Sequence, residues 1–147
     1  MPSPTAEQLV GFAQSTLDSA GIRGQDAPGL ARALAKTTAQ ALAMFLSQAQ
    51  VLPGIPASAP PPANSGSTVG PGSLLPPPAG GPTAAQIEGL ALADLKGEGI
   101  AGANAPDLAK VIAGSLAQAI ELFTAQVQVA PGIAISGLVT SSPGNLV

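Results

Sequence analysis

Apolar residues recur three and four positions apart in four stretches of the chain, which is the spacing of one face of an α-helix. Two of these stretches lie between residues 5 and 50, and the other two lie between residues 83 and 127. A short glycine-containing connector separates the members of each pair, at 21–25 and 99–103. Connectors of this length join antiparallel helices. The pattern therefore predicts two helical hairpins.

Residues that start and stop helices occur where this prediction needs them. Thr5 is followed three positions later by Gln8, the spacing of a capping box. Gly21 is suited to the position just after a helix, and Pro28 to the first turn of the next one. The same residue types recur in the second pair of helices. These signals predict a long second helix from Asp26 to Gln50 and its counterpart, residues 104–128.

The two pairs of helices belong to an internal repeat. Residues 5–58 match residues 83–136 without a gap at an offset of 78, with 25 identical residues. The ends of the two copies also match, because residues 71–75 resemble residues 143–147. We therefore divide the chain into a first repeat unit (1–75), a linker (76–82) and a second repeat unit (83–147). Each unit consists of a hairpin followed by a tail.

The expected fold class is mainly α. We expect the two hairpins to pack as a pseudo-two-fold four-helix bundle, since short connectors favour antiparallel neighbours. Each long helix carries an apolar stripe with a phenylalanine near its end. The predicted helix-packing anchors are Leu34, Phe45, Ile112 and Phe123.

The tails are predicted to be extended arms, at residues 51–75 and 128–147. The first arm is rich in proline and glycine, and the runs at 60–62 and 76–78 favour polyproline II. One interpretation is a disordered linker, and the other is an arm bound to a neighbouring subunit. The matching ends of the two tails favour the bound arm.

The second arm alternates apolar and small or polar residues, which predicts short β-strands. Pro131 and Gly132 are suited to a turn between two of these strands. A lone two-stranded ribbon is marginal in water, so the arm is better suited to the edge of a partner's sheet. The predicted partner-binding residues of the two arms are Val51, Ile55, Leu74, Leu75, Val129, Ile133, Ile135 and Leu146.

Composition favours a protein that works within an assembly. The chain is 46% hydrophobic but only 2% aromatic, so its core is built from small aliphatic side chains. Charged residues make up 9%, with a formal net charge of −3. An ordinary domain carries about 25% charged residues. So few charges protect a free monomer poorly against association.

Catalytic chemistry is not expected. The chain has no Cys and no His, which removes the usual ligands of zinc, haem and iron–sulfur groups and the usual nucleophile–base pairs. Gly97–Gly102 has the letters of a dinucleotide fingerprint but follows a predicted helix and not a strand. Asp94 and Glu98 lie four apart on one helix face, and charge at a helix end explains them better than acid–base work. We expect no enzyme activity and no cofactor.

Other partners are also limited by the sequence. Five scattered basic residues cannot neutralise a phosphate backbone, so nucleic-acid binding is not expected. No uninterrupted apolar run approaches the roughly 18 residues of a membrane span, and no membrane partner is expected. The start of the chain lacks the pattern of a secretion signal.

The alanine-rich hairpins with their tails resemble small virion proteins of tailed bacteriophages. The resemblance rests on Leu116–Phe123, on the Val-x-Val-x-Pro-Gly-Ile stretch inside 127–135, and on the end of the chain at 142–146. It covers the second helix and the tail of each unit. It implies a minor structural protein of the particle, located in the virion and assembled in the host cytoplasm.

The leading hypothesis is a capsid decoration or cement protein that docks its arms on neighbouring subunits. Its partners would be capsid or tail proteins and further copies of itself, as a dimer or as a trimer with six repeat units. The first alternative is a tail- or connector-associated structural protein. The second is a non-viral helical adaptor or a granule-coat protein.

Overall fold

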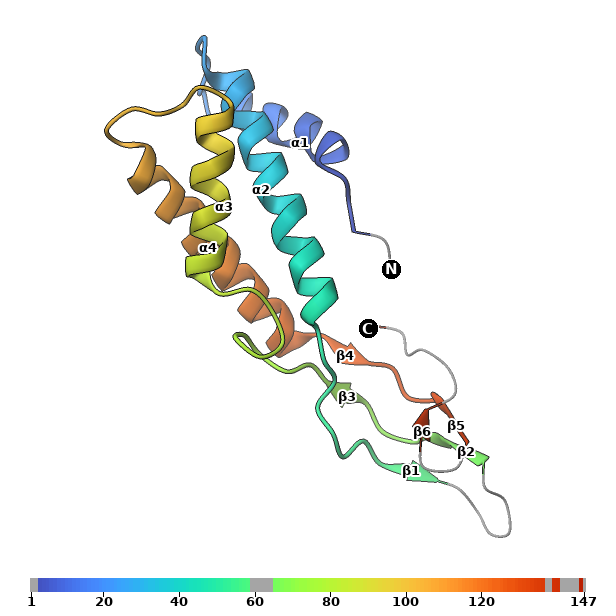
Figure 1. The fold of residues 1–147 in the computed structure, drawn as a ribbon. Helices are drawn as coiled ribbons and strands as arrows, with labels where there is room; N and C mark the ends of the chain where they lie inside the picture. The colour runs from blue at the N-terminus through green and yellow to red at the C-terminus, as the bar shows by residue number, and fades with distance from the viewer. Residues whose placement is uncertain (1–2, 59–64, 137–138, 141–145, 147) are drawn as a thin grey trace. The chain divides into compact units, whose positions relative to one another are not determined.

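The chain is mainly helical, with short strands. The computed structural model describes residues 3–58, 65–136, 139–140 and 146. Two helices of 14 residues alternate with two of 22, and the strands follow each of the longer helices (Figure 1). The helices are α1 (Ala6–Ser19), α2 (Ala27–Gln48), α3 (Ala84–Gly97) and α4 (Ala105–Gln126).

The predicted helix signals are confirmed at both α1 and α3. The Thr5 hydroxyl accepts a hydrogen bond from the Gln8 N–H at 3.4 Å, and the Gln8 side chain accepts one from the Thr5 N–H at 2.9 Å. Thr83 and Gln86 make the same capping box. After α1 and after α3 the chain turns at a glycine with positive φ, Gly21 and Gly99 respectively.

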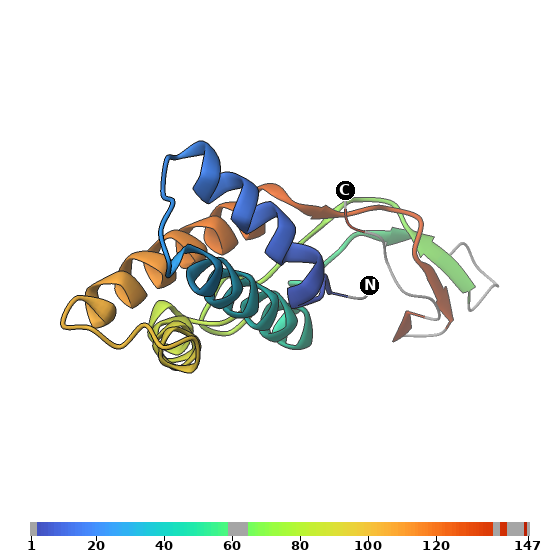
Figure 2. The ribbon, with the colours of Figure 1, turned by 90° about the horizontal axis from the view of Figure 1, so that it is seen from above.

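By their contacts, α1, α2, α3 and α4 up to Ile120 form one compact unit made of Met1–Gln48 and Gly81–Ile120, and the end of α4 belongs to the other unit. α1 packs against α2, and α2 packs against α3. Figure 2 shows α1 and α3 on different sides of α2. The core of this unit is shared by three helices and consists of Ala33, Ala91, Leu95, Ala109 and Ile112.

Polar side chains tie α2 to α3 across the alanine-rich contact. The Thr37 hydroxyl, which is fully buried, donates to Asp94 at 2.9 Å. The Glu98 carboxylate accepts a hydrogen bond from Lys36 at 2.6 Å on one oxygen and from Arg32 at 2.7 Å on the other. These two bonds lower the pKa of Glu98 below its ordinary value. Asp94 and Glu98 therefore serve the helix contact, a role that their spacing along the chain did not indicate.

The four predicted anchors lie at different depths. Phe45 and Ile112 are buried, at 3% and 6% exposure, and Leu34 is half-buried. Phe123, the repeat equivalent of Phe45, is 46% exposed. The two phenylalanines thus occupy matching positions on matching helices in different surroundings.

One described helix, α4, is long and apolar enough to cross a membrane by length and composition alone. Glycine, serine and charged residues interrupt its apolar run, so the length of uninterrupted apolar runs in the sequence does not reveal it. Core helices of soluble proteins meet the same criterion, and α4 contributes Ala109 and Ile112 to the helical core. This property alone is weak evidence for a membrane.

The arms form the second compact unit, made of Ala49–Gly80 and Glu121–Val147. Antiparallel strands build a four-stranded sheet of order β1-β2-β5-β6 and a two-stranded sheet of β3 and β4. The strands are β1 (Ala57–Ser58), β2 (Ser65–Thr68), β3 (Gly72–Ser73), β4 (Gln128–Val129), β5 (Ala134–Ser136) and β6 (Val139–Thr140).

Two details of the arms differ from the sequence predictions. Gly132 does separate two strands and has φ of 92°, but β4 and β5 do not pair with each other. Instead, β4 pairs with β3 and β5 pairs with β2, and both of these partners belong to the first arm. The predicted polyproline helix at 76–78 is wrong, because residues 77–79 form a turn closed by the Gly80 N–H on the Pro76 carbonyl. The run at 60–62 lies outside the described residues.

Candidate partner-binding arms

The two arms bind each other, and Thr68 is the centre of this contact. Its backbone N–H donates to the Ile133 carbonyl at 3.0 Å, and its hydroxyl accepts from the Ile133 N–H at 3.0 Å. Its carbonyl accepts from the Gly132 N–H at 2.8 Å. Thr68 is 6% exposed, so these bonds satisfy groups that water does not reach. One residue therefore links the first arm to the turn of the second.

A second contact joins the arms through β3 and β4. Gly72 pairs with Val129 in the β3–β4 ladder, and the first arm also folds back so that Val51 bridges to Leu74. A Cβ at Gly72 would lie 2.6 Å from the Ile55 side chain. A Cβ at position 72 would force the Ile55 side chain to shift, so the first arm is closely packed on itself at this point.

The predicted partner-binding residues fall into two groups. Leu74, Val129 and Ile133 are buried, at 6%, 3% and 9% exposure. Each of them lies inside the arm unit, next to residues that pair within or between the arms. The others are accessible to different degrees: Val51 is 43% exposed, and Ile55, Leu75, Ile135 and Leu146 are half-buried.

Exposed apolar side chains of the arm unit mark its candidate docking surface. Val69 is 60% exposed, Val51 43% and Leu52 38%. Their backbones are nevertheless engaged, since the Leu52 N–H donates to Ser73 and the Val69 N–H donates to Pro56, each at 2.8 Å. We group Val51, Leu52 and Val69 by their exposure and call them together the arm patch. A backbone held in place that presents apolar side chains to water is suited to binding another protein.

Sequence reasoning did not identify Leu52, Val69 or Thr68. Thr68 and Val69 are adjacent β-branched residues within a Ser- and Gly-rich stretch, and such residues favour strands. That local signal was available. Its importance depends on the second arm, which begins 60 residues further along the chain.

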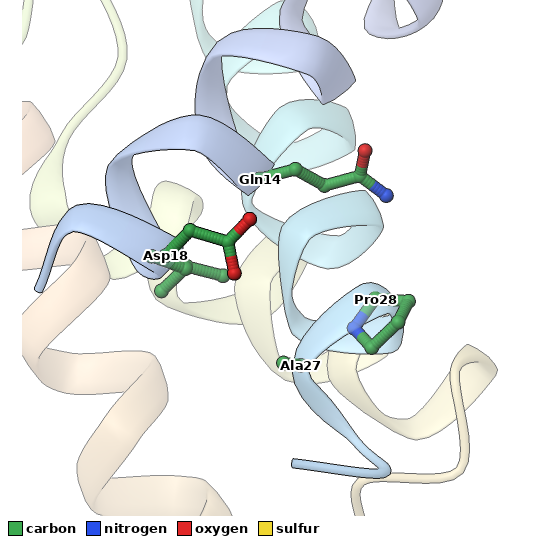
Figure 3. A pocket seen from close by; sticks show the side chains of 5 residues that line it. Gln14, Asp18, Ala27 and Pro28 are labelled. Carbon is green, nitrogen blue, oxygen red and sulfur yellow. The ribbon is translucent and has the colours of Figure 1, made fainter. Parts of the chain in front are cut away.

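The described residues offer little chemistry. No group of three or more Asp and Glu among them is placed to hold a metal ion. A hollow of about 160 Å³ lies where α1 meets the start of α2 (Figure 3). Its acid, Asp18, lies 3.8 Å from Arg23, and both side chains are largely in solvent. This hollow has neither the depth nor the grouped polar atoms of a binding site.

Comparisons with protein families, curated proteins and solved structures find no match for this chain. The function must therefore be argued from the helices and from the arm patch.

Proposed function

We propose that this protein is a structural component of a tailed-bacteriophage particle, a decoration or cement protein that docks its arms on neighbouring subunits. The observation that carries the proposal is the arm patch. Its apolar side chains are exposed on backbone that is already hydrogen-bonded, so docking them costs little ordering entropy. Low charge along the whole chain fits a protein that is covered on several sides.

The mechanism of stabilisation is multivalency. Each copy in a dimer or trimer carries one arm patch, so one docking event raises the effective concentration of the next. Several weak contacts then lower the rate at which the chain leaves the particle. The partners are capsid or tail subunits and other copies of this chain, in a dimer or a trimer with six repeat units.

A partner strand would extend the sheet at β1. In the described part of the chain, Ala57 and Ser58 pair on one side only, with Thr68 and Ser67. Such an edge offers backbone N–H and C=O groups to an extended segment of another subunit. Sheet extension supplies the affinity, and the nearby Val69 side chain supplies an apolar contact.

The pseudo-two-fold four-helix bundle is part of the proposal for the assembled protein. A hollow of about 360 Å³ in the helical unit is lined by two pairs of repeat-equivalent residues. Ile22 and Ile100 form one pair, and Leu30 and Leu108 form the other. The other residues around this hollow come from the first copy alone, so a full bundle would need contacts beyond those made within one chain.

The test is the protein content of purified particles. Phage particles are banded by density, and heads are then separated from tails. The expected result is this chain in the heads at a copy number that matches capsid symmetry. Its presence in tails alone would instead support the tail- or connector-associated role. Absence from both fractions, with the protein present in the lysate, would refute the proposal.

A granule-coat or membrane-surface role is the second candidate, and α4 is the observation that favours it. α4 meets the length and composition of a membrane span, and Val111 and Leu122 on it are exposed at 68% and 61%. A gain of helix signal on adding anionic or neutral lipid vesicles would support this role. An unchanged circular dichroism spectrum with no co-sedimentation would exclude it.

A further inference from the structure

The repeat allows one helix contact inside the chain to be compared with the equivalent contact that the chain does not make. α3 covers a face of α2 that includes Ala33, Lys36 and Thr37, through the shared core, the Glu98 ion pair and the Asp94 hydrogen bond. Ala33 and Thr37 are both fully buried there. This α2–α3 contact joins the first hairpin to the second.

The equivalent face of α4 is open. Its residues are Val111, Gly114 and Ser115, which stand 78 positions after those of the α2 face. Val111 is 68% exposed and Ser115 is exposed. A Cβ built on Gly114 meets nothing within 4 Å. We call these three residues the α4 face.

The equivalent ridge of α1 is open as well. In α3 the ridge that meets α2 contains Asp94 and Glu98, with Leu90 one turn earlier. Its equivalents on α1 are Phe12, Thr16 and Ala20, which we call the α1 ridge. Phe12 is 72% exposed, and Thr16 and Ala20 are exposed too. The chain therefore exposes both halves of a contact that it makes elsewhere.

The chemistry of these two surfaces favours burial. Phe12 stands where α3 has Leu90, and Val111 stands where α2 has Ala33, so both are larger than their counterparts. The charged group at Glu98 is replaced by Ala20, and the one at Lys36 by Gly114. Small residues at these two positions allow the helices to approach closely. Thr16 and Ser115 stand where Asp94 and Thr37 form their hydrogen bond, and each of their hydroxyls donates to a carbonyl of its own helix, so neither is left unsatisfied when the surface is buried.

We infer that the α1 ridge of one copy packs on the α4 face of a second copy, repeating between chains the α2–α3 contact made within each chain. A second copy is the occupant because it carries the surface that each open surface lacks. The α2–α3 contact within the chain shows how helices with equivalent surfaces pack. The chain's own α1 is already engaged, since its Leu17 side is buried and α1 packs on α2.

This contact is head-to-tail, because the two surfaces are different. Head-to-tail contacts close into a ring when the rotation between copies permits it, and otherwise build a filament. Each added copy extends one series of hairpins, in which internal and intermolecular contacts alternate. The inference concerns self-assembly and does not depend on a phage origin or on the arm patch.

Complementation between two variants tests the head-to-tail geometry. Phe12→Lys destroys only the α1 ridge, and Val111→Lys destroys only the α4 face. Each variant alone is expected to lose self-association by about 100-fold in Kd, since a lysine is buried without a partner. An equimolar mixture still has one intact pair of surfaces and is expected to form a one-to-one dimer. Ser15→Lys, on an exposed part of α1 outside the ridge, is the matched control and is expected to assemble normally.

Disulfide trapping tests the register of the α1 ridge on the α4 face. The chain has no native cysteine, so no other thiol competes for the disulfide. Thr16→Cys and Ser115→Cys occupy the positions equivalent to the hydrogen-bonded Asp94 and Thr37. Mixed and mildly oxidised, the two single variants are expected to give mainly the mixed disulfide. Ser15→Cys mixed with Ser115→Cys is the control and is expected to give at least about tenfold less of it.

Four results would overturn the inference. The first is a native chain that stays monomeric in native mass spectrometry at high concentration. The second is a failure of the two lysine variants to complement each other. The third is a Thr16→Cys, Ser115→Cys double variant that forms only an internal disulfide, which would show that a chain closes on its own α1. The fourth is a monomer whose binding to lipid vesicles is lost in Phe12→Lys and Val111→Lys, which would assign both surfaces to a membrane.

Discussion

Phe45 and Phe123 provide a matched pair in which only the surroundings differ. Both are phenylalanines near the end of a 22-residue helix, and they stand 78 positions apart in the repeat. Phe45 is 3% exposed and Phe123 is 46% exposed. Replacing each with alanine removes the same atoms from the same kind of helix, so the difference between the two losses reports how each side chain is surrounded.

The expected magnitudes follow from these exposures. Burying a phenylalanine side chain is worth about 1.5–3 kcal/mol, and the cavity left by its removal raises the loss for Phe45→Ala to about 3–5 kcal/mol. About half of the Phe123 side chain is already in water, so Phe123→Ala leaves no closed cavity and should cost about 1–1.5 kcal/mol. The free energies of unfolding should therefore differ by about 2 kcal/mol or more.

Urea unfolding followed by far-ultraviolet circular dichroism is the suitable assay, because the chain has neither Trp nor Tyr for fluorescence. With a urea m-value of about 2 kcal/mol/M, the midpoints of the two variants should differ by about 1 M. All samples need the same protein concentration, since self-association raises apparent stability. Equal midpoints, or a larger loss for Phe123→Ala, would refute the different burial of the two positions.

Three further predictions concern single positions. Gly80→Ala places a Cβ 1.8 Å from the Leu75 carbonyl oxygen and should lower the free energy of unfolding in urea by about 1–3 kcal/mol. Gly89→Ala has open space around it on helix α3 and should raise the free energy of unfolding by about 0.5–1 kcal/mol. Glu98→Gln should lower the free energy of unfolding near neutral pH. The difference in this free energy from the native chain should shrink as the pH falls through the lowered pKa of Glu98, because the folded state then gains the proton that the unfolded state already holds. A difference that stays constant across this pH range in thermal melts would contradict the ion-pair assignment. Thr68→Val leaves the buried Ile133 N–H without its acceptor and should cost about 1–3 kcal/mol, with faster amide hydrogen exchange at Ile133 and unchanged exchange in α2.

The helices could be predicted from the sequence because their signals are local. The capping boxes at Thr5 and Thr83 and the first-turn Pro28 each depend on residues within one turn. The spacing of apolar residues then gives the length. These features placed four helices within a few residues of their observed ends.

The partners of the arms could not be predicted, because strand pairing joins residues that are distant in the sequence. Alternation in the second arm predicted strands, but nothing local indicates that β5 pairs with β2 and not across the turn at Gly132. The depth of burial of individual side chains could not be predicted either. The repeat predicted equal roles for Phe45 and Phe123, yet burial depends on what covers each helix, and the two helices are covered differently.

The difference between the two copies of the hairpin is the best guide to what the protein contacts. A duplicated unit starts with equal surfaces, so every position at which one copy is buried and the other is exposed marks a contact that only one copy makes within the chain. The α2 face is covered while the α4 face is open, and the α3 ridge is covered while the α1 ridge is open. These open surfaces remain apolar, as Phe12 and Val111 show. The covered α2 face and α3 ridge are partly charged, whereas their exposed equivalents are apolar. Contact with a partner explains an exposed apolar surface better than contact with water does. The α2–α3 contact within the chain shows how such a partner would pack.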